Sequence, residues 1–350
     1  MAIDQLIEDG DNYYYVDING VMAANQWVAI DNEDAGQDDE PDHYWYYFQA
    51  NGKALKNGDN SKVALKTVNG KKYAFDDEGR MLFGWVSADN AERIDNTDGD
   101  GFKEGDYYFG GEDDGAMTVG WLQMDITYDE ATSDYEIAPV FNDDEDQTRW
   151  FYFKSNGKKV KAENGDTQKS KTINGKKYEF DQYGAMTAEW SLDVDTASTS
   201  GLRGDNATAT HSVSAQYAKQ WRYFQDVENG ARVSKGWFKV VSAEYLNYDK
   251  YNDDEDAWYY ADGSGNLYAG QFKTIKGKKY AFRNDGRMID GLKFIQMDSA
   301  NNITGVIADD HDTNPFDTED DFNKNSDDAV PSASIGYKLT DMSNLRFGYN

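Results

Sequence analysis

A short motif that recurs along the chain constrains its fold more than any other feature of the sequence. Residues 70–73, 175–178 and 277–280 all read Gly-Lys-Lys-Tyr, and each copy is followed by Gly-x-Met. The tyrosines of these copies, Tyr73, Tyr178 and Tyr280, are separated by 105 and 102 residues. Self-similarity of this kind is typical of repeat architectures, in which each unit packs mainly on its neighbours. Length alone therefore does not predict two or three compact domains.

Two further classes of aromatic repeat lie between these copies. One class begins at Trp45, Trp150 and Trp258, and the other occupies residues 13–16, 106–109 and 221–224. Three classes in three super-units, near residues 13–105, 106–220 and 221–292, predict about nine hairpin units. We expect residues 1–292 to form these repeats with acidic inserts, and residues 293–350 to form a degenerate repeat and a C-terminal cap.

Turn chemistry between the aromatic runs indicates short antiparallel strands. Asn-Gly, Gly-Lys and Asp-x-x-Gly segments favour the positive φ angles of tight hairpin turns. The chain has 32 glycines and 4 prolines, and no stretch keeps a 3.6-residue apolar period. Because an isolated hairpin is marginally stable in water, each unit must bury one face against its neighbours. The sequence therefore predicts an all-β fold, an elongated solenoid of stacked β-hairpin repeats.

Strand alternation separates a core face from an outer face, because residues two apart point to the same side of a strand. The predicted core residues are Tyr46, Phe48, Tyr73, Phe75, Phe151, Phe153, Tyr178 and Phe180. The outer face carries the rings of Trp45, Tyr47, Trp150, Tyr152, Trp221, Tyr223, Trp258 and Tyr260. In the lysine-rich class it carries Lys72, Ala74, Lys177, Glu179, Lys279 and Ala281. Rings that the repeat does not require for packing are candidate ligand-binding residues; packing of these rings on the inserts is the alternative.

Charge and composition exclude several classes of function. The formal net charge is −30 at pH 7, which disfavours binding to nucleic acid and to anionic membrane surfaces. There are no cysteines, and no apolar run is long enough to span a bilayer. The 65 Asp and Glu residues do not by themselves indicate glycoside hydrolysis, which needs two carboxylates at a defined separation in a rigid cleft. The histidines His43, His211 and His311 show no metal-ligating spacing and no catalytic-triad signature. We therefore expect no enzymatic activity, no nucleic-acid partner and no membrane insertion.

Residues 96–101, Asn-Thr-Asp-Gly-Asp-Gly, resemble the start of a calcium-binding loop. Oxygen ligands at alternate positions and a glycine at the sixth position suit a hard cation, which makes Asn96, Asp98 and Asp100 candidate metal ligands. The match is incomplete, because the twelfth position is Tyr107, where a bidentate glutamate is expected. Calcium at this loop is the one cofactor that the sequence suggests, and otherwise none is expected.

Residues 45–52 and 69–81, which close on Gly84-Trp85, resemble the cell-wall-binding repeat family. That family includes choline-binding modules, glucan-binding repeats of glucansucrases and receptor-binding repeats of clostridial toxins. In the choline-binding branch, the resemblance implies sites between successive repeats, where rings enclose a quaternary ammonium by cation–π attraction. The matching positions are Trp27, Trp85, Trp121, Trp190 and Trp237, with Tyr47, Tyr108, Tyr152 and Tyr223. This chain departs from that branch in its long inserts and in Gly291-Leu292, which replaces Gly-Trp.

The resemblance implies a non-catalytic module that anchors a secreted or surface protein to carbohydrate or cell-wall polymer. The expected partner is a glucan or a choline-bearing teichoic acid, and the expected location is extracellular or cell-wall-associated. Met1 to Asp4 lack the features of a signal peptide, so we expect none in the sequence given. The best candidate pairs are Trp27 with Tyr47, Trp121 with Tyr152, and Trp237 with Tyr260. The alternative function is a surface adhesin or structural stalk that recognises a protein or host receptor.

Overall fold

The computed structural model describes residues 2–58, 61–127, 146–164, 166, 168–192, 214–244, 246–291, 293, 295–306, 336–340 and 343–346. The secondary structure of these residues is almost entirely β. Two short helices, α3 (Ala215–Ala218) and α4 (Tyr248–Asn252), lie in inserts between paired strands. The prediction of an all-β fold built from hairpins is confirmed.

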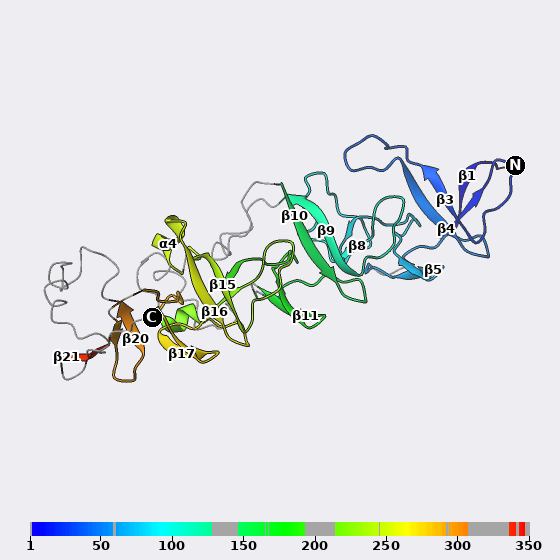
Figure 1. Ribbon diagram of the computed structural model, residues 1–350. Coiled ribbons are helices and arrows are strands. Elements are labelled where there is room, and N and C mark those ends of the chain that lie inside the picture. Colours follow the sequence, from blue (N-terminus) through cyan, green and yellow to red (C-terminus); the bar gives the residue numbers. More distant parts are fainter. Residues whose placement is uncertain are drawn as a thin grey trace. The chain divides into compact units, whose positions relative to one another are not determined.

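Nine two-stranded sheets follow one another along the described part of the chain (Figure 1). They are β1 (Gln5–Asp9) with β2 (Asn12–Val16), β3 (Gln26–Asp31) with β4 (His43–Phe48), β5 (Lys66–Val68) with β6 (Lys71–Tyr73), β7 (Trp85–Val86) with β8 (Tyr107–Tyr108), β9 (Gly120–Thr127) with β10 (Asp146–Phe153), β11 (Lys169–Ile173) with β12 (Lys176–Phe180), β13 (Trp190–Leu192) with β14 (Trp221–Tyr223), β15 (Gly236–Val241) with β16 (Asp256–Ala261), and β17 (Gln271–Ile275) with β18 (Lys278–Phe282). A four-stranded sheet follows, in the order β20 (Ile303–Val306), β19 (Ile295–Met297), β22 (Ser343–Arg346), β21 (Gly336–Thr340).

The turns after β6 and β12 are each fixed by a carboxylate and a glycine. The Asp76 side chain accepts hydrogen bonds from the backbone N–H groups of Glu78 and Arg80, at 3.0 and 2.8 Å. Asp181, the equivalent residue in the next copy of the Gly-Lys-Lys-Tyr repeat, accepts in the same way from the N–H groups of Tyr183 and Ala185. Gly79 and Gly184 close these turns at φ values of +88° and +87°. Only glycine takes such angles without strain, so the Asp-x-x-Gly spacing sets the turn.

Successive hairpins are joined by one recurring backbone hydrogen bond. The residue six positions after the core aromatic bridges back to that aromatic, as Met81 does to Phe75 and Lys159 to Phe153. We call this residue the bridge residue. Its N–H donates to a carbonyl oxygen of the preceding hairpin, from Met81 to Trp45 and from Lys159 to Asp106, both at 2.7 Å. This bond satisfies a backbone donor that a two-stranded hairpin leaves unpaired.

The predicted core face is buried. Phe48, Phe75, Phe153 and Phe180 are 0% exposed, and the predicted core tyrosines beside them are also buried. The outer face is less buried than the core face, as predicted, at Trp45 and Tyr47, which are half-buried, and at Lys72, which is exposed. The prediction is wrong at Ala74 and Glu179. Ala74 packs in one cluster with Leu82 and Phe109, and Glu179 accepts a hydrogen bond from Ser170, so the outer position beside the core phenylalanine is covered in these two hairpins.

The chain divides into two compact units. Unit 1 comprises residues 1–131, 141–171 and 179–186, and unit 2 comprises residues 132–140, 172–178 and 187–350. A core cluster among the described residues of unit 2 includes the aromatic side chains of Trp190, Trp221 and Tyr259. In unit 1 the acidic insert 31–42 is tied to a later insert, because Asp39 pairs with Arg93 at 2.7 Å and accepts from the N–H of Asn96. Inserts are therefore packed elements here and not merely solvated loops.

Candidate functional site

The five tryptophans at the predicted repeat junctions each face a tyrosine across their hairpin. Trp27, Trp85, Trp121, Trp190 and Trp237 are the register partners of Tyr47, Tyr108, Tyr152, Tyr223 and Tyr260. Within each pair the ring centroids are 5.0 to 5.1 Å apart in an edge-to-face arrangement. Hairpin pairing thus brings together the predicted residue pairs, which lie far apart in the sequence. We call each pair, with the rings of the next hairpin, a junction.

The junctions of Trp27 and Trp237 have nearly the same geometry. Trp27 lies 4.9 Å from Tyr73 and 5.9 Å from Phe75, measured between ring centroids. Trp237 lies 4.8 Å from Tyr280 and 5.9 Å from Phe282. Both tryptophans are half-buried, so part of each indole reaches solvent.

The Trp121 junction is built in the same way from β9 and β10. Trp121 lies 5.8 Å from Phe180 and makes an edge contact with Trp150 at 6.2 Å. The Nζ atom of Lys171 lies 5.9 Å from the centroid of the Tyr152 ring. Trp121, Trp150 and Tyr152 are all half-buried. We refer to the junctions of Trp27, Trp121 and Trp237 as the open junctions.

The Trp85 junction is closed by an insert, and the prediction of an accessible ring at this position is wrong. Trp85 is 2% exposed and packs with the fully buried Phe102 of the insert. The insert backbone runs directly against the indole: a methyl group added at Gly105 would lie 2.5 Å from Trp85 Cε3, and one at Gly101 would lie 3.1 Å from Cδ1. Glycine at these positions lets the backbone approach the ring this closely.

The Trp190 junction is closed as well. Trp190 is 7% exposed and Trp221 is 0% exposed. The outer-face prediction is therefore wrong for Trp221, and the ring of Trp190, a candidate ligand-binding residue, is covered. The indole N–H of Trp190 donates to the carbonyl oxygen of Val241 at 2.8 Å, and Phe238 stacks on Tyr223 at 4.7 Å. Burial raises the pKa of Tyr223 to about 12. The insert that follows β15 and the α3 segment supply the cover.

The remaining predicted outer rings are accessible to different degrees. Trp258 is 44% exposed and meets Trp237 edge to face. Trp45 donates its indole N–H to Asp113 at 2.9 Å, and the same carboxylate contacts His43 Nε2 at 2.9 Å. These two hydrogen bonds lower the pKa of Asp113, with that from Trp45 as the larger cause. The sequence did not predict the contact of Asp113 with Trp45, because Asp113 belongs to no recognised motif and lies 68 residues from Trp45.

The candidate calcium loop is held by its own hydrogen bonds. Asn96 Oδ1 accepts from the N–H of Gly101 at 3.0 Å, and Asp100 lies 3.8 Å from Lys103 Nζ. Asp98 is exposed. Among the residues that the structure describes, no group of three or more His, Cys, Asp or Glu side chains converges as a metal site. Calcium binding by this loop stays a prediction.

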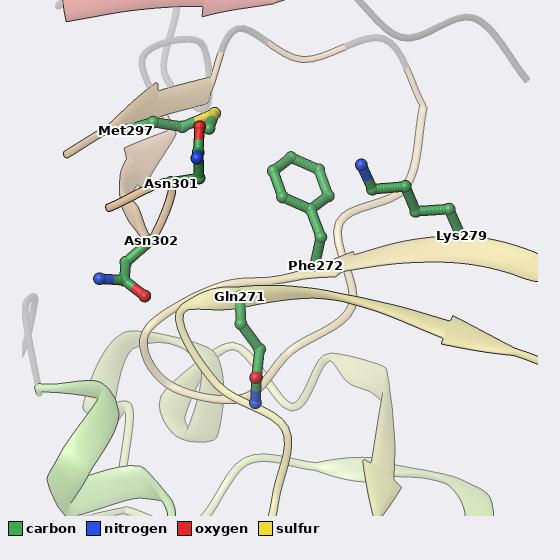
Figure 2. Close-up of a pocket in the computed structure, with 6 residues that line it drawn as sticks. All are labelled: Gln271, Phe272, Lys279, Met297, Asn301 and Asn302. Atoms are coloured by element: carbon green, nitrogen blue, oxygen red, sulfur yellow. The ribbon is translucent and has the colours of Figure 1, made fainter. Parts of the chain in front are cut away.

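A cavity of about 450 Å³ lies beside the hairpin β17–β18 in unit 2. Figure 2 shows the ring of Phe272 between Met297 and Asn301 on one side and Lys279 on the other. Gln271 and Asn302 complete the lining. The Nζ atom of Lys279 lies 4.6 Å from the centroid of the Phe272 ring, so the chain itself covers one face of this ring.

Comparison with known proteins finds similarity to a cell-wall-binding repeat and to a streptococcal glucosyltransferase. Residues 4–22, which contain β1 and β2, match the family model described as "Putative cell wall binding repeat". Glucosyltransferase-S of Streptococcus mutans serotype c is 24% identical over 310 residues, which are 86% of this chain. The chain spans 15% of the length of that curated relative. The resemblance to the cell-wall-binding repeat family is confirmed.

Solved structures from Streptococcus pneumoniae are also similar. Choline binding protein F, crystallised in the presence of a peptidoglycan analogue, is 18% identical, with 85% of this chain and 92% of that chain covered at a TM-score of 0.40. The choline-binding domain of CbpL is 17% identical, with 83% and 99% covered, also at a TM-score of 0.40. Among the described residues of this chain, no helix has the length and apolarity to cross a membrane.

Proposed function

We propose that this chain is a non-catalytic module that binds carbohydrate or cell-wall polymer through its open junctions. The observation that carries the proposal is the recurrence of one arrangement, a half-buried tryptophan with its tyrosine partner at 5.0 to 5.1 Å, at Trp27, Trp121 and Trp237. A ring that the core alone required would be fully covered, as Trp85 is. Partly exposed aromatic rings can stack on sugar rings and attract cations.

The cell-wall-binding repeat matched at residues 4–22 supports the same class of ligand. The candidate polymers are a neutral glucan and a choline-bearing teichoic acid. Anchoring of a secreted or surface protein to such a polymer follows from this proposal. The cavity beside Phe272 carries no part of it, because Lys279 already lies over that ring.

The test replaces the tryptophans of the open junctions by leucine, which keeps apolar volume against the neighbouring phenylalanines and removes the indole. Trp27→Leu, Trp121→Leu and Trp237→Leu should each remove one class of site in a calorimetric titration with glucan oligosaccharides and with choline. The triple variant should lose binding to the polymer. Circular dichroism confirms that each variant retains its β structure.

The matched control is Tyr251→Ala, because Tyr251 is 43% exposed and lies in α4, outside every junction. This variant should bind as the parent does. Unchanged binding by the triple variant contradicts the proposal. A blank glycan array, combined with retention on intact cells that the triple variant loses, supports the adhesin function instead.

A further inference from the structure

One position of the repeat differs in charge at the Trp85 junction. The bridge residues that follow the rings of the five junctions are Met81, Lys159, Met186, Leu267 and Met288. Four of these five side chains are apolar, and Lys159 replaces methionine at the junction of Trp85. The bridge residue packs on the turn glycine of a following hairpin: a methyl group at Gly184 would lie 2.7 Å from Lys159 Cδ. The stem of Lys159 therefore packs on its turn glycine as Met81 packs on Gly115.

The ammonium of Lys159 lies within the Trp85 junction. Its Nζ atom is 4.9 Å from the centroid of the Trp85 ring and 5.7 Å from that of Phe151. Nζ also donates a hydrogen bond to the carbonyl oxygen of Phe102, in the insert that covers the indole. Lys159 is 3% exposed, so this cation is removed from water.

Two ring faces and a carbonyl oxygen together form a small cation site. Ring faces attract cations most strongly when the cation is desolvated, and a carbonyl oxygen accepts one of the three ammonium protons. Burial lowers the pKa of Lys159 to about 7, and Lys161 acts in the same direction, whereas Asp181 and Asp106 act in the opposite direction. The side chain is therefore an ammonium below about pH 7. A buried ammonium without such partners would strongly destabilise the fold.

We propose that the ammonium of Lys159 is a built-in ligand of the Trp85 junction, which is a binding site for a primary alkylammonium that the chain itself fills. This inference does not depend on the proposed function, because it concerns the occupant of a closed junction. It assigns a cation site between Trp85, Phe151 and the Phe102 carbonyl oxygen, and it removes this junction from those that take an external ligand.

The test is chemical complementation of Lys159→Ala at pH 6. Propylammonium carries the three carbons and the ammonium that this substitution deletes. It should raise the thermal midpoint of Lys159→Ala saturably, and at about ten times its Kd the folded-to-unfolded ratio should rise about tenfold. The neutral probe 1-propanol, of the same length, should stabilise the variant far less. Sodium chloride matches the ionic strength throughout.

Two controls make the result specific. Wild-type protein, whose site is filled, should not respond to propylammonium. Met81→Ala creates a cavity at the equivalent bridge residue of the Trp27 junction, and it should show no preference for propylammonium over 1-propanol. Equal stabilisation of Lys159→Ala by the two probes, or an equal response of the wild type, overturns the proposal.

A second measurement does not need the cavity variant. In wild-type protein labelled with 13C-lysine, the Hε protons of Lys159 should be shifted upfield by the ring current of Trp85. This signal should be missing from Lys159→Met, which has the side chain that other repeats carry at the bridge residue. If no upfield lysine signal is lost in Lys159→Met, the ammonium is not in the junction and the proposal fails.

Discussion

At the scale of single residues, burial is concentrated in one aromatic position of the repeat. Phe48, Phe75, Phe153, Phe180 and Phe282 are each 0% exposed, whereas the tryptophans of the open junctions remain half-buried. Each of these phenylalanines follows another aromatic residue by two positions. Phe75, Phe153, Phe180 and Phe282 lie against the tryptophans of the junctions. The same residues thus hold the hairpins together and form the floor of the junctions.

Truncation of one of these phenylalanines should strongly destabilise the protein. Phe75→Ala removes a fully buried ring, which typically costs about 3–5 kcal/mol. Urea denaturation followed by circular dichroism measures the loss. The control is Ile18→Ala, because Ile18 is 70% exposed, and it should leave the free energy of unfolding nearly unchanged. Similar losses in the two variants would contradict the assignment of the core.

Lys159 should make stability depend on pH above neutrality. Burial lowers the pKa of Lys159 to about 7, whereas the pKa of an unfolded lysine is about 10.4. Between these values the unfolded chain binds more protons, so the free energy of unfolding rises with pH. Below about pH 7 both states are protonated and this contribution is constant. The free energy of unfolding of the wild type minus that of Lys159→Met should therefore increase from pH 6 to about pH 10, as measured by denaturation. If this difference does not change with pH, the lowered pKa of Lys159 is contradicted.

The sequence predicted single residues well where the repeat alone decides their surroundings. The core phenylalanines were identified from alternation, because their neighbours belong to the next copy of the same motif. Trp85 and Trp190 were misplaced, because their cover comes from inserts that no repeat pattern describes. A signal was present for Trp85, since Gly101 and Gly105 flank Phe102 in its insert, and Lys159 stands where its own repeat class has Ala54 and Leu267.

At the scale of the hairpin, the turn glycine and the bridge residue act as one packing device. Gly184 has a φ of +87° and a methyl group there would lie 2.7 Å from Lys159 Cδ. Gly70 has a similar φ of +83°, but a methyl group there would meet nothing within 4 Å. A side chain at Gly70 would therefore meet only backbone strain, whereas a side chain at Gly184 would meet backbone strain and a steric clash with Lys159.

Gly184→Ala should destabilise the protein more than Gly70→Ala. Each substitution places a side chain at positive φ, at a cost of about 1–2 kcal/mol, and overpacking at Gly184 adds roughly 1–3 kcal/mol. Thermal unfolding of both variants measures the difference. In a Lys159→Ala background the additional cost at Gly184 should largely disappear, because the side chain that fills the space is gone. If the additional cost persists there, Lys159 is not the neighbour that limits this turn.

The pairing of elements was harder to predict than their existence. Turn chemistry and aromatic runs indicated nine hairpins, and nine two-stranded sheets are present in the described residues. The sequence predicted Trp27 and Tyr47 as partners in a candidate site, but it did not predict that their strands form one hairpin across the acidic insert 31–42. Such pairings depend on contacts between distant segments. The predicted super-unit boundaries and the cap over residues 293–350 stay predictions.

At the scale of the whole molecule, the net charge of −30 should discriminate between the candidate polymers. A neutral glucan has no net Coulomb interaction with the chain, so its binding should hardly change when salt is raised from about 0.05 to about 0.5 M. An anionic wall polymer is repelled at low salt, and its binding should strengthen over the same range. Calorimetry at both salt concentrations measures this. Glucan binding that falls steeply with salt would contradict stacking as its basis.

Unit 1 carries two open junctions, at Trp27 and Trp121. Once a polymer occupies one of them, the second contact forms within the same complex, at an effective concentration on the order of millimolar. Avidity then holds the polymer even though each contact is weak and exchanges rapidly. On the proposed function, a free monosaccharide or free choline therefore competes poorly with the intact polymer. A fragment long enough to reach both junctions competes well, so the length of the ligand matters as much as its chemistry.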